Sequence, residues 1–231
     1  MTAPLTIWTY DWVPQGPRGH VRDIRLRWAC AEAGLHFTIA TVRFEDRTGP
    51  DHLDRQPFAQ VPALQDGDIT LFESGACLLY LAESSDILMP RDPQSRAETL
   101  QWVIAGLNSV EMVSVPWWFI GLSKPAENPL ESWLNARLDR LATVLKSRDW
   151  LAAGRFTVAD LLMADILRVP KLRAMLGPFP ALEAYVTRVL DRPAFRQALK
   201  DQLDHFAAAD AARAKGSGAK GSAAQSPGTK G

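Results

Sequence analysis

Apolar and polar positions follow two different periods in the first third of the chain. Short segments rich in β-branched and aromatic residues are typical of strands, whereas residues 20–34 carry apolar side chains near helical spacing. That segment ends at Gly34, a common stop residue for a helix. Asp66 and Gly67 separate two apolar runs and predict a hairpin. The expected strands are residues 4–10, 36–44, 61–64 and 69–72, and the expected helices are residues 20–34 and 74–84.

Beyond residue 93 the strand signals vanish. Thr157 and Asp160 form a capping-box pattern that marks the clearest helix start. Helices are expected near residues 94–122, 129–148, 158–169, 181–190 and 194–206. The chain therefore divides into an α/β domain (1–84), a linker with proline punctuation (85–93), an all-helical domain (94–206) and a low-complexity tail (207–231) that we expect to be disordered.

The composition is that of a globular protein able to bury a core, because 47% of its 231 residues are hydrophobic and 23% are charged. The formal net charge is zero, so no long-range field attracts nucleic acid or an anionic membrane. The amino terminus lacks the pattern of a signal peptide, and no apolar run approaches the roughly 20 residues that span a bilayer. We expect a cytoplasmic protein with neither nucleic acid nor membrane as partner.

Cysteine and histidine are sparse. Cys30 and Cys77 form no C-x-x-C pair, and both are typical of small buried fillers. The histidines show no metal-ligand spacing, which predicts a protein without a metal. They are His20, His36, His52 and His205.

The stretch AQVPALQDGDITLFESGACLLYL, residues 59–81, leaves two interpretations open. Pro62 removes a backbone donor, so it either ends an edge strand or shapes the backbone to hold a ligand. Ser74 at the start of the next helix is either a plain N-cap or a ligand-binding group. The joint occurrence of the two residues at this spacing favours a binding site.

The order of elements resembles the soluble, bacterial-like glutathione S-transferases. Three segments carry the resemblance, which covers roughly residues 5–206: AQVPALQDGDITLFESGACLLYLAE, RWACAEAGL and FTVADLLMADI. It implies a thioredoxin-like amino-terminal domain with a mixed four-stranded sheet, followed by an all-α domain. It also implies a homodimer, and glutathione as co-substrate with no further cofactor.

The resemblance implies a cis peptide bond before Pro62, which turns the Val61 main chain outward. A short peptide such as glutathione can then lie alongside as an extra strand. Ser74 and the helix amino terminus suit the γ-glutamyl carboxylate, Glu73 suits the ammonium, and Gln60 helps to position the ligand.

Activation of the glutathione thiol needs one further group, because its pKa of about 8.5 leaves little thiolate at neutral pH. The family places this group at the end of the first strand or the start of the first helix. No serine precedes Ser74, and Tyr10 ends the first strand, so Tyr10 is the leading candidate with Thr9 behind it. Backbone N–H groups of the long loop DWVPQGPRG, or Arg18 within it, are the alternative.

Nearby arginines add positive potential at the sulfur. Arg22 and Arg18 are assigned this role, whereas Arg25 and Arg27 are assigned to an ordinary solvated helix face. For the second substrate we expect an apolar wall built from Trp12, Val13, Trp117 and Trp118. Adjacent tryptophans cannot share one helix face, so at least one of Trp117 and Trp118 is expected to pack in the core.

The function predicted from these features is conjugation of the glutathione thiolate to a small electrophilic apolar compound. Two alternatives keep the same site. One is another glutathione-dependent reaction, namely dehalogenation, isomerisation or peroxide reduction. The other is a non-catalytic glutathione-binding or regulatory protein of the same fold.

Overall fold

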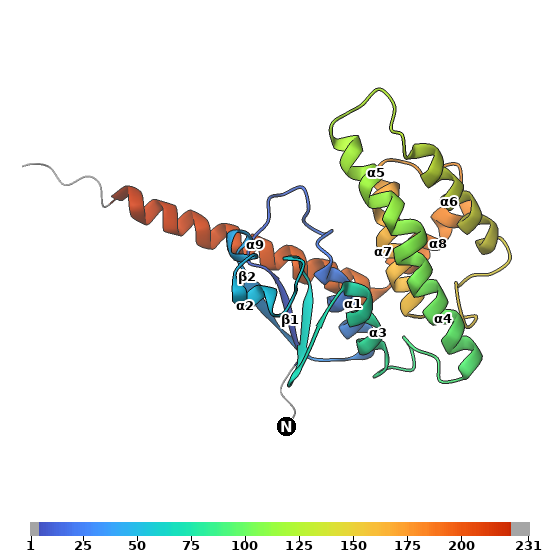
Figure 1. The fold of residues 1–231 in the computed structure, drawn as a ribbon, viewed down its shortest axis with the longest axis horizontal. Helices are drawn as coiled ribbons and strands as arrows, with labels where there is room; N and C mark the ends of the chain where they lie inside the picture. Colours follow the sequence, from blue (N-terminus) through green and yellow to red (C-terminus); the bar gives the residue numbers. More distant parts are fainter. Residues whose placement is uncertain (1–4, 223–231) are drawn as a thin grey trace, which may run out of the picture.

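The first domain is built on a mixed four-stranded sheet, as the sequence predicts. The structure is a computed structural model that describes the backbone of residues 5–222 and the side chains of residues 5–215. Figure 1 shows the sheet on one side of the molecule and most of the helices on the other. Its elements are β1 (Leu5–Tyr10), α1 (Asp23–Ala33), β2 (Phe37–Val42), η1 (Phe44–Asp46), α2 (Pro50–Leu53), β3 (Ala63–Asp66), β4 (Ile69–Phe72) and α3 (Ser74–Ala82).

The strand order is β2-β1-β3-β4, with β1 and β2 parallel and β3 antiparallel to both of its neighbours. Side chains alternate between the two faces of a strand. Ile7 and Thr9 are therefore fully buried on one face of β1, while Trp8 on the other face lies under the Arg55 guanidinium, 3.8 Å away. The hairpin expected at Asp66 and Gly67 is present as β3 and β4.

Strand register brings three separate stretches of sequence to one edge of this sheet. Ala63 pairs with Trp8 on one side and with Phe72 on the other. The two residues before Ala63, the two after Phe72 and the end of β1 at Tyr10 therefore lie side by side. This edge contains the residues that the sequence analysis selected for glutathione.

The second domain is all-helical and is organised around one buried helix. Its elements are α4 (Pro93–Ala105), the π-helical stretch η2 (Gly106–Glu111), α5 (Met112–Leu122), α6 (Glu131–Leu145), α7 (Val158–Leu172), α8 (Pro180–Leu190) and α9 (Pro193–Ser222). Helix α7 starts with the predicted Thr157–Asp160 capping box and is buried from Val158 to Leu167. It packs against α4, α5 and α8 in its own domain and against α1 and α3 of the first, so it joins the two domains through one apolar core.

The segment Pro93–Leu122 forms a continuous helix of 30 residues. By length and composition it is the one helix among residues 5–222 that meets the requirements for crossing a membrane. A single helix of this kind is weak evidence, because core helices of soluble proteins meet the same requirements. Here the helix packs on α7 and carries the buried Glu111.

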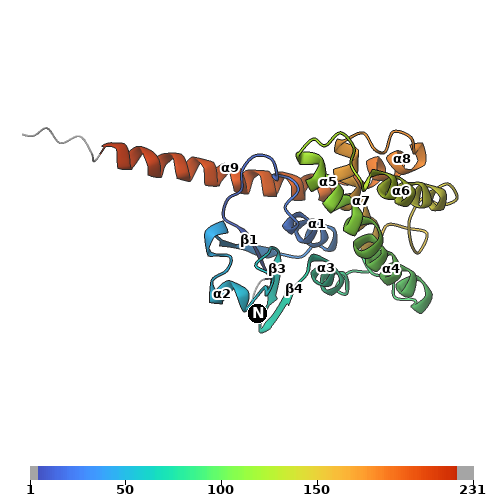
Figure 2. The same cartoon turned by 45° about the horizontal axis from the view of Figure 1, so that its top comes forward.

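Helix α9 departs from the expected boundary at residue 207. It continues to Ser222, where a disordered tail was expected after Phe206. Residues 207–214 are mainly alanine, the residue with the highest intrinsic helix propensity, so nothing there stops the helix. Figures 1 and 2 show α9 crossing from the helical domain past α1 and projecting beyond the sheet. Residues 223–231 of the expected tail lie outside the described residues.

Candidate functional site

The Val61–Pro62 peptide bond is cis, as the resemblance implied. Within residues 5–222 the Val61 N–H and C=O make no hydrogen bond. The preceding turn is held from behind, since the buried His52 donates from Nε2 to the Gln60 carbonyl at 2.8 Å, and the Gln60 side chain is exposed. The Val61 main chain is therefore a short, fixed strand edge that can pair with a peptide.

Glu73 and Ser74 stand beside this edge at the start of α3. Glu73 has a φ of 68°, a conformation that non-glycine residues rarely adopt and that clusters at functional sites. Its side chain is exposed and has no partner among the described residues. The first N–H groups of α3 have no acceptor within the helix. The site therefore offers a free carboxylate next to a helix amino terminus that favours an anion.

Ser74 is held by a buried arginine. Arg25 donates from Nη1 to Ser74 Oγ at 2.9 Å, from Nη2 to Glu111 at 2.7 Å and from Nε to Asp165 at 2.7 Å. Although burial alone would raise the pKa of Glu111 and of Asp165, the Arg25 guanidinium holds both pKa values below their ordinary range. Both carboxylates are thus ionised at neutral pH and belong to the second domain, so this cluster ties the sheet edge at Val61 and Ser74 to the helical domain.

The assignment of Arg25 and Arg27 to a solvated face is wrong. Their exposed fractions are 2% and 3%, because α1 packs against α3, α7 and α9 at once and retains no open face. Arg27 pairs with Asp23, one helical turn earlier, at 2.8 Å. The signal that was missed lies in the second domain, where Glu111 and Asp165 occur within apolar helical segments.

Tyr10 lies at the same edge, but its ring packs against Phe44 of η1 at a centroid distance of 5.4 Å. Its hydroxyl makes no hydrogen bond within the described residues, and burial raises its pKa, partly opposed by Arg47. The hydroxyl therefore stays protonated and can donate. Thr9 is fully buried on the opposite face of β1.

The two arginines assigned to the sulfur have protein partners. Arg22 contacts Glu111, with Nη2 3.0 Å from Oε1, and so extends the Arg25 cluster toward the start of α1. Arg18 instead donates to Asp210 of α9 at 2.6 Å and to the Val13 carbonyl at 2.9 Å. The structure brings Arg22, and not Arg18, into contact with the cluster that holds Ser74.

His20 is a titratable group in the loop three residues before α1, and the sequence analysis considered it only as a metal ligand. It is half-buried, and burial followed by the charge of Arg168 lowers its pKa, against a smaller opposing effect of Asp165. Its imidazole is therefore neutral at physiological pH and can exchange a proton with a neighbour. Position just before the first helix was the signal that could have identified it.

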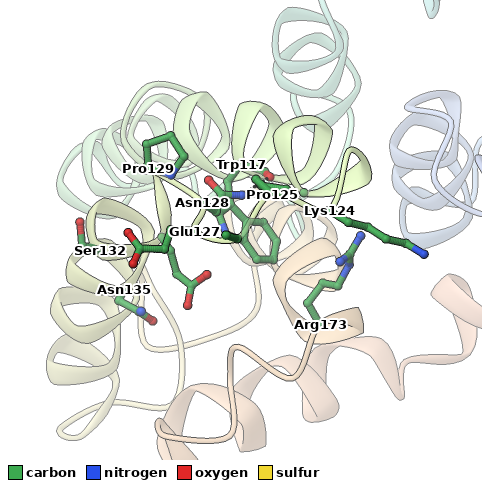
Figure 3. Close-up of a pocket in the computed structure, with 12 residues that line it drawn as sticks. Trp117, Lys124, Pro125, Glu127, Asn128, Pro129, Ser132, Asn135 and Arg173 are labelled. Carbon is green, nitrogen blue, oxygen red and sulfur yellow. Dashed lines mark hydrogen bonds between the residues drawn. The ribbon is translucent and has the colours of Figure 1, made fainter.

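The four residues assigned to the second substrate do not line one cavity. Trp117 is 6% exposed and lines a cavity of about 880 Å³, where its carbonyl accepts a hydrogen bond from Asn128 at 2.8 Å. Figure 3 shows Lys124 and Arg173 on one side of this cavity and acidic and amide side chains on the other. Trp118 stacks under the Arg173 guanidinium at 4.6 Å.

The other pair, Trp12 and Val13, lies in the loop between β1 and α1. Val13 is buried, with 6% of its surface exposed, and the Trp12 indole N–H donates to Asp210 at 2.7 Å. Both are fixed by contacts with the loop itself and with α9, whereas Trp117 belongs to the cavity at the end of α5.

Both cysteines are buried, and burial raises the pKa of each thiol to about 12. Neither is a nucleophile at neutral pH. Within the described part of the chain no three His, Cys, Asp or Glu side chains are grouped to hold a metal ion.

Comparison with known proteins matches both domains. The family profile for the glutathione S-transferase amino-terminal domain matches residues 16–83, and the profile for the carboxy-terminal domain matches residues 123–193. The chain is 30% identical over 179 residues to a probable glutathione S-transferase, GSTF2, of Oryza sativa subsp. japonica, covering 70% of this chain and 83% of that protein.

Bacterial proteins are similar too. Glutathione S-transferase GstA of Escherichia coli O157:H7 is 27% identical over 176 residues, covering 73% of this chain and 88% of GstA. A Pseudomonas putida glutathione transferase, crystallised with one glutathione disulfide per subunit, superimposes with a TM-score of 0.74 at 23% identity, covering 85% of this chain and 91% of that one.

Proposed function

The chain belongs to the glutathione S-transferase family, and from this premise we propose that it binds glutathione and conjugates its sulfur to a small electrophilic apolar compound. Members of this family are soluble and typically cytosolic, and a cytoplasmic location is part of the proposal. One observation carries it: strand register places the unpaired Val61 main chain beside Glu73 and Ser74.

Glutathione binding uses the groups at this edge. The cysteinyl part of glutathione pairs with the Val61 N–H and C=O, as an added strand does. The γ-glutamyl carboxylate lies at the amino terminus of α3, where backbone N–H groups and the Ser74 hydroxyl donate to it. The exposed Glu73 carboxylate pairs with the ammonium, and Gln60 lines the opposite side.

The reaction begins with loss of the thiol proton to solvent water, and a hydrogen bond from the protein stabilises the thiolate that remains. The thiolate then attacks the electrophilic carbon, a carbon–sulfur bond forms, and the leaving group departs with the electron pair of its bond. Tyr10 is the proposed donor to the sulfur, because its hydroxyl is unpartnered and protonated. His20, which is neutral and lies in the loop just before α1, is the second candidate. Arg22 adds positive potential.

The second substrate is proposed to bind beside the loop that carries Trp12 and Val13, because Trp117 lines a separate cavity at the end of α5 and Trp118 stacks under the Arg173 guanidinium. Loops at the rim of a rigid scaffold commonly carry the specificity of a site.

We also propose that the chain forms a homodimer. Light scattering of the purified chain measures its mass directly, and a monomer mass would contradict this proposal.

A non-catalytic glutathione-binding protein is the second candidate function. The observation in its favour is that the Tyr10 ring packs on Phe44 while Arg18 is occupied by Asp210, which leaves the sulfur few donors. Titration calorimetry with glutathione, followed by turnover of a panel of aryl halides, epoxides and peroxides, distinguishes the candidates. Binding with turnover supports the transferase, binding without turnover supports the second candidate, and the absence of binding contradicts both.

A further inference from the structure

The loop between β1 and α1 spans residues 11–22, and its residues 11–20, here called the rim loop, border the proposed site. Its first end continues β1 beyond Tyr10, beside the Val61–Pro62 edge. Its second end leads into α1, which contacts Ser74 through Arg25. Two backbone hydrogen bonds fold the second half of the loop, from the Arg18 N–H to the Gln15 carbonyl at 3.2 Å and from the His20 N–H to the Pro17 carbonyl at 2.9 Å.

One carboxylate on α9 holds the rim loop at two points. Asp210 accepts from the Trp12 indole N–H at 2.7 Å and from Arg18 Nη1 and Nη2 at 2.6 and 2.8 Å. Arg18 also donates from Nε and Nη2 to the Val13 carbonyl at 3.1 and 2.9 Å. A single guanidinium therefore joins the first half of the loop, the second half and α9.

Further contacts come from the same stretch of α9, residues 205–213, which we call the α9 strap. His205 Nε2 donates to the Tyr10 carbonyl at 3.0 Å, and the Arg213 guanidinium lies 4.3 Å from the Trp12 ring centre. The strap thus contacts Tyr10, Trp12 and Arg18, three of the residues proposed for chemistry or for the second substrate. Figures 1 and 2 show the backbone of α9 running past the loop between β1 and α1.

The hydrogen bonds of Asp210 serve the rim loop, while inside α9 its carboxylate interacts with the charge of Arg213, three residues later. The Asp210 side chain is 43% exposed, and every hydrogen bond that the structure records for its carboxylate goes to the rim loop. Aspartate is a weaker helix former than the alanines on either side of it. All recorded hydrogen bonds of the carboxylate therefore go to the loop, and its contact with its own helix is electrostatic.

We propose that the α9 strap holds the rim loop in the conformation that accepts the second substrate, with Asp210 as the positioning residue. This inference rests on the proposed function, since it assigns the control of second-substrate binding to a helix outside the glutathione edge. Glutathione itself is bound by Val61, Glu73 and Ser74, which the strap does not contact.

The test replaces Asp210 and compares it with a matched residue on the same helix. Asp210→Asn keeps the size of the side chain and removes the charge that holds Arg18. Asp204→Asn is the control, because Asp204 pairs with Lys200 of α9 at 2.5 Å and is 61% exposed. Both purified variants are examined by hydrogen exchange of residues 11–20, by calorimetry with glutathione, and by steady-state kinetics with chlorodinitrobenzene.

In Asp210→Asn we expect faster exchange in the rim loop and a rise of roughly tenfold or more in the KM for chlorodinitrobenzene, because small misplacements of a positioning group are costly. The glutathione dissociation constant and the melting temperature stay as in the control. The variant Arg18→Gln should show the same rise in the KM for chlorodinitrobenzene. The double variant with Asp210→Asn should show no larger rise, because the two residues act as one unit.

If the hydrogen exchange of residues 11–20 is the same in Asp210→Asn as in the wild type, the proposal that the α9 strap holds the rim loop is wrong. Faster exchange with an unchanged KM for chlorodinitrobenzene overturns the positioning role. If the wild-type protein binds glutathione but converts no electrophile, the proposed transferase function fails, and with it the second-substrate role of Asp210. That result is recognised in the wild type before any variant is measured, so the two failures are distinguishable.

Discussion

Arg25 donates to the hydroxyl oxygen of Ser74 across the boundary between α1 and α3, with Nη1 2.9 Å from Oγ. A serine hydroxyl that accepts a hydrogen bond still has its own proton to donate. Arg25 therefore leaves the Ser74 O–H free to donate to the carboxylate of the proposed glutathione ligand, and it adds a positive charge behind the hydroxyl. The same guanidinium is held by Glu111 and Asp165 of the second domain, so the ligand edge and the domain interface share one residue.

Replacing Arg25 is expected to be strongly destabilising. Arg25→Met leaves two buried carboxylates without their main partner, and breaking a buried ion pair in this way costs about 3–5 kcal/mol. The free energy of unfolding from denaturant titration measures this loss. Arg140→Met, at an exposed position of α6, is the control and should change stability little. A loss for Arg25→Met as small as that of the control would show that the cluster is not coupled to folding.

Ser74→Ala is expected to weaken glutathione binding without unfolding the protein. A hydrogen bond to a charged group contributes about 1.5–3 kcal/mol, so the dissociation constant should rise roughly 10- to 100-fold. Calorimetry measures the constant. Ser84→Ala is the matched control, because the Ser84 hydroxyl donates to the Leu81 carbonyl at the far end of α3. Equal affinities of the two variants would remove Ser74 from the binding site.

Tyr10→Phe is expected to lower kcat while the affinity for glutathione stays the same. The lost donor to the sulfur corresponds to a fall of roughly 10- to 100-fold, and the apparent pKa of bound glutathione, read from thiolate absorbance, should rise. Tyr80→Phe is the control, because the Tyr80 hydroxyl donates to Asp66 at 2.8 Å, outside the proposed reaction centre. If Tyr10→Phe behaves as that control and His20→Gln raises the pKa of bound glutathione, the role passes to His20.

The sequence predicted the main parts of the fold because they depend on local signals. The Asp66–Gly67 hairpin and the Thr157–Asp160 capping box are formed within a few residues of chain. The proximity of Pro62 to the helix start at Ser74 could also be predicted from the sequence, since the short hairpin between them fixes their distance in space. These local signals located the proposed glutathione edge.

What the sequence did not predict depends on packing between distant segments. Arg25 is buried because helices from both domains cover α1, and its partners Glu111 and Asp165 lie 86 and 140 residues away. The contact of Asp210 with Arg18 spans 192 residues. No periodicity within a single helix reveals such partners, so the solvated face assigned to Arg25 followed from considering α1 alone.

The ion cluster also predicts how stability depends on pH. Burial alone would raise the pKa values of Glu111 and Asp165, but Arg25 lowers both below their ordinary values of 4.5 and 3.8. The unfolded chain therefore binds these protons more readily than the folded protein does. The stabilisation is complete only well above the unfolded pKa of Glu111, where both carboxylates are ionised in the folded and the unfolded state. It starts to decline as the pH approaches the unfolded values, and it is lost as the pH falls through the lowered folded values.

Glu111→Gln isolates this contribution, because the amide keeps the shape of the side chain and cannot titrate. The variant is expected to be less stable than the wild type at pH 7, since Arg25 and Arg22 lose a charged partner. The difference between the two proteins should shrink as the pH falls below about 4, because protonation of Glu111 then removes the same charge from the wild type. Denaturant titrations of both proteins at a series of pH values measure the difference. A gap that stays constant down to the acid transition would mean that Glu111 has no lowered pKa, and that the contact between the domains depends on packing instead of charge.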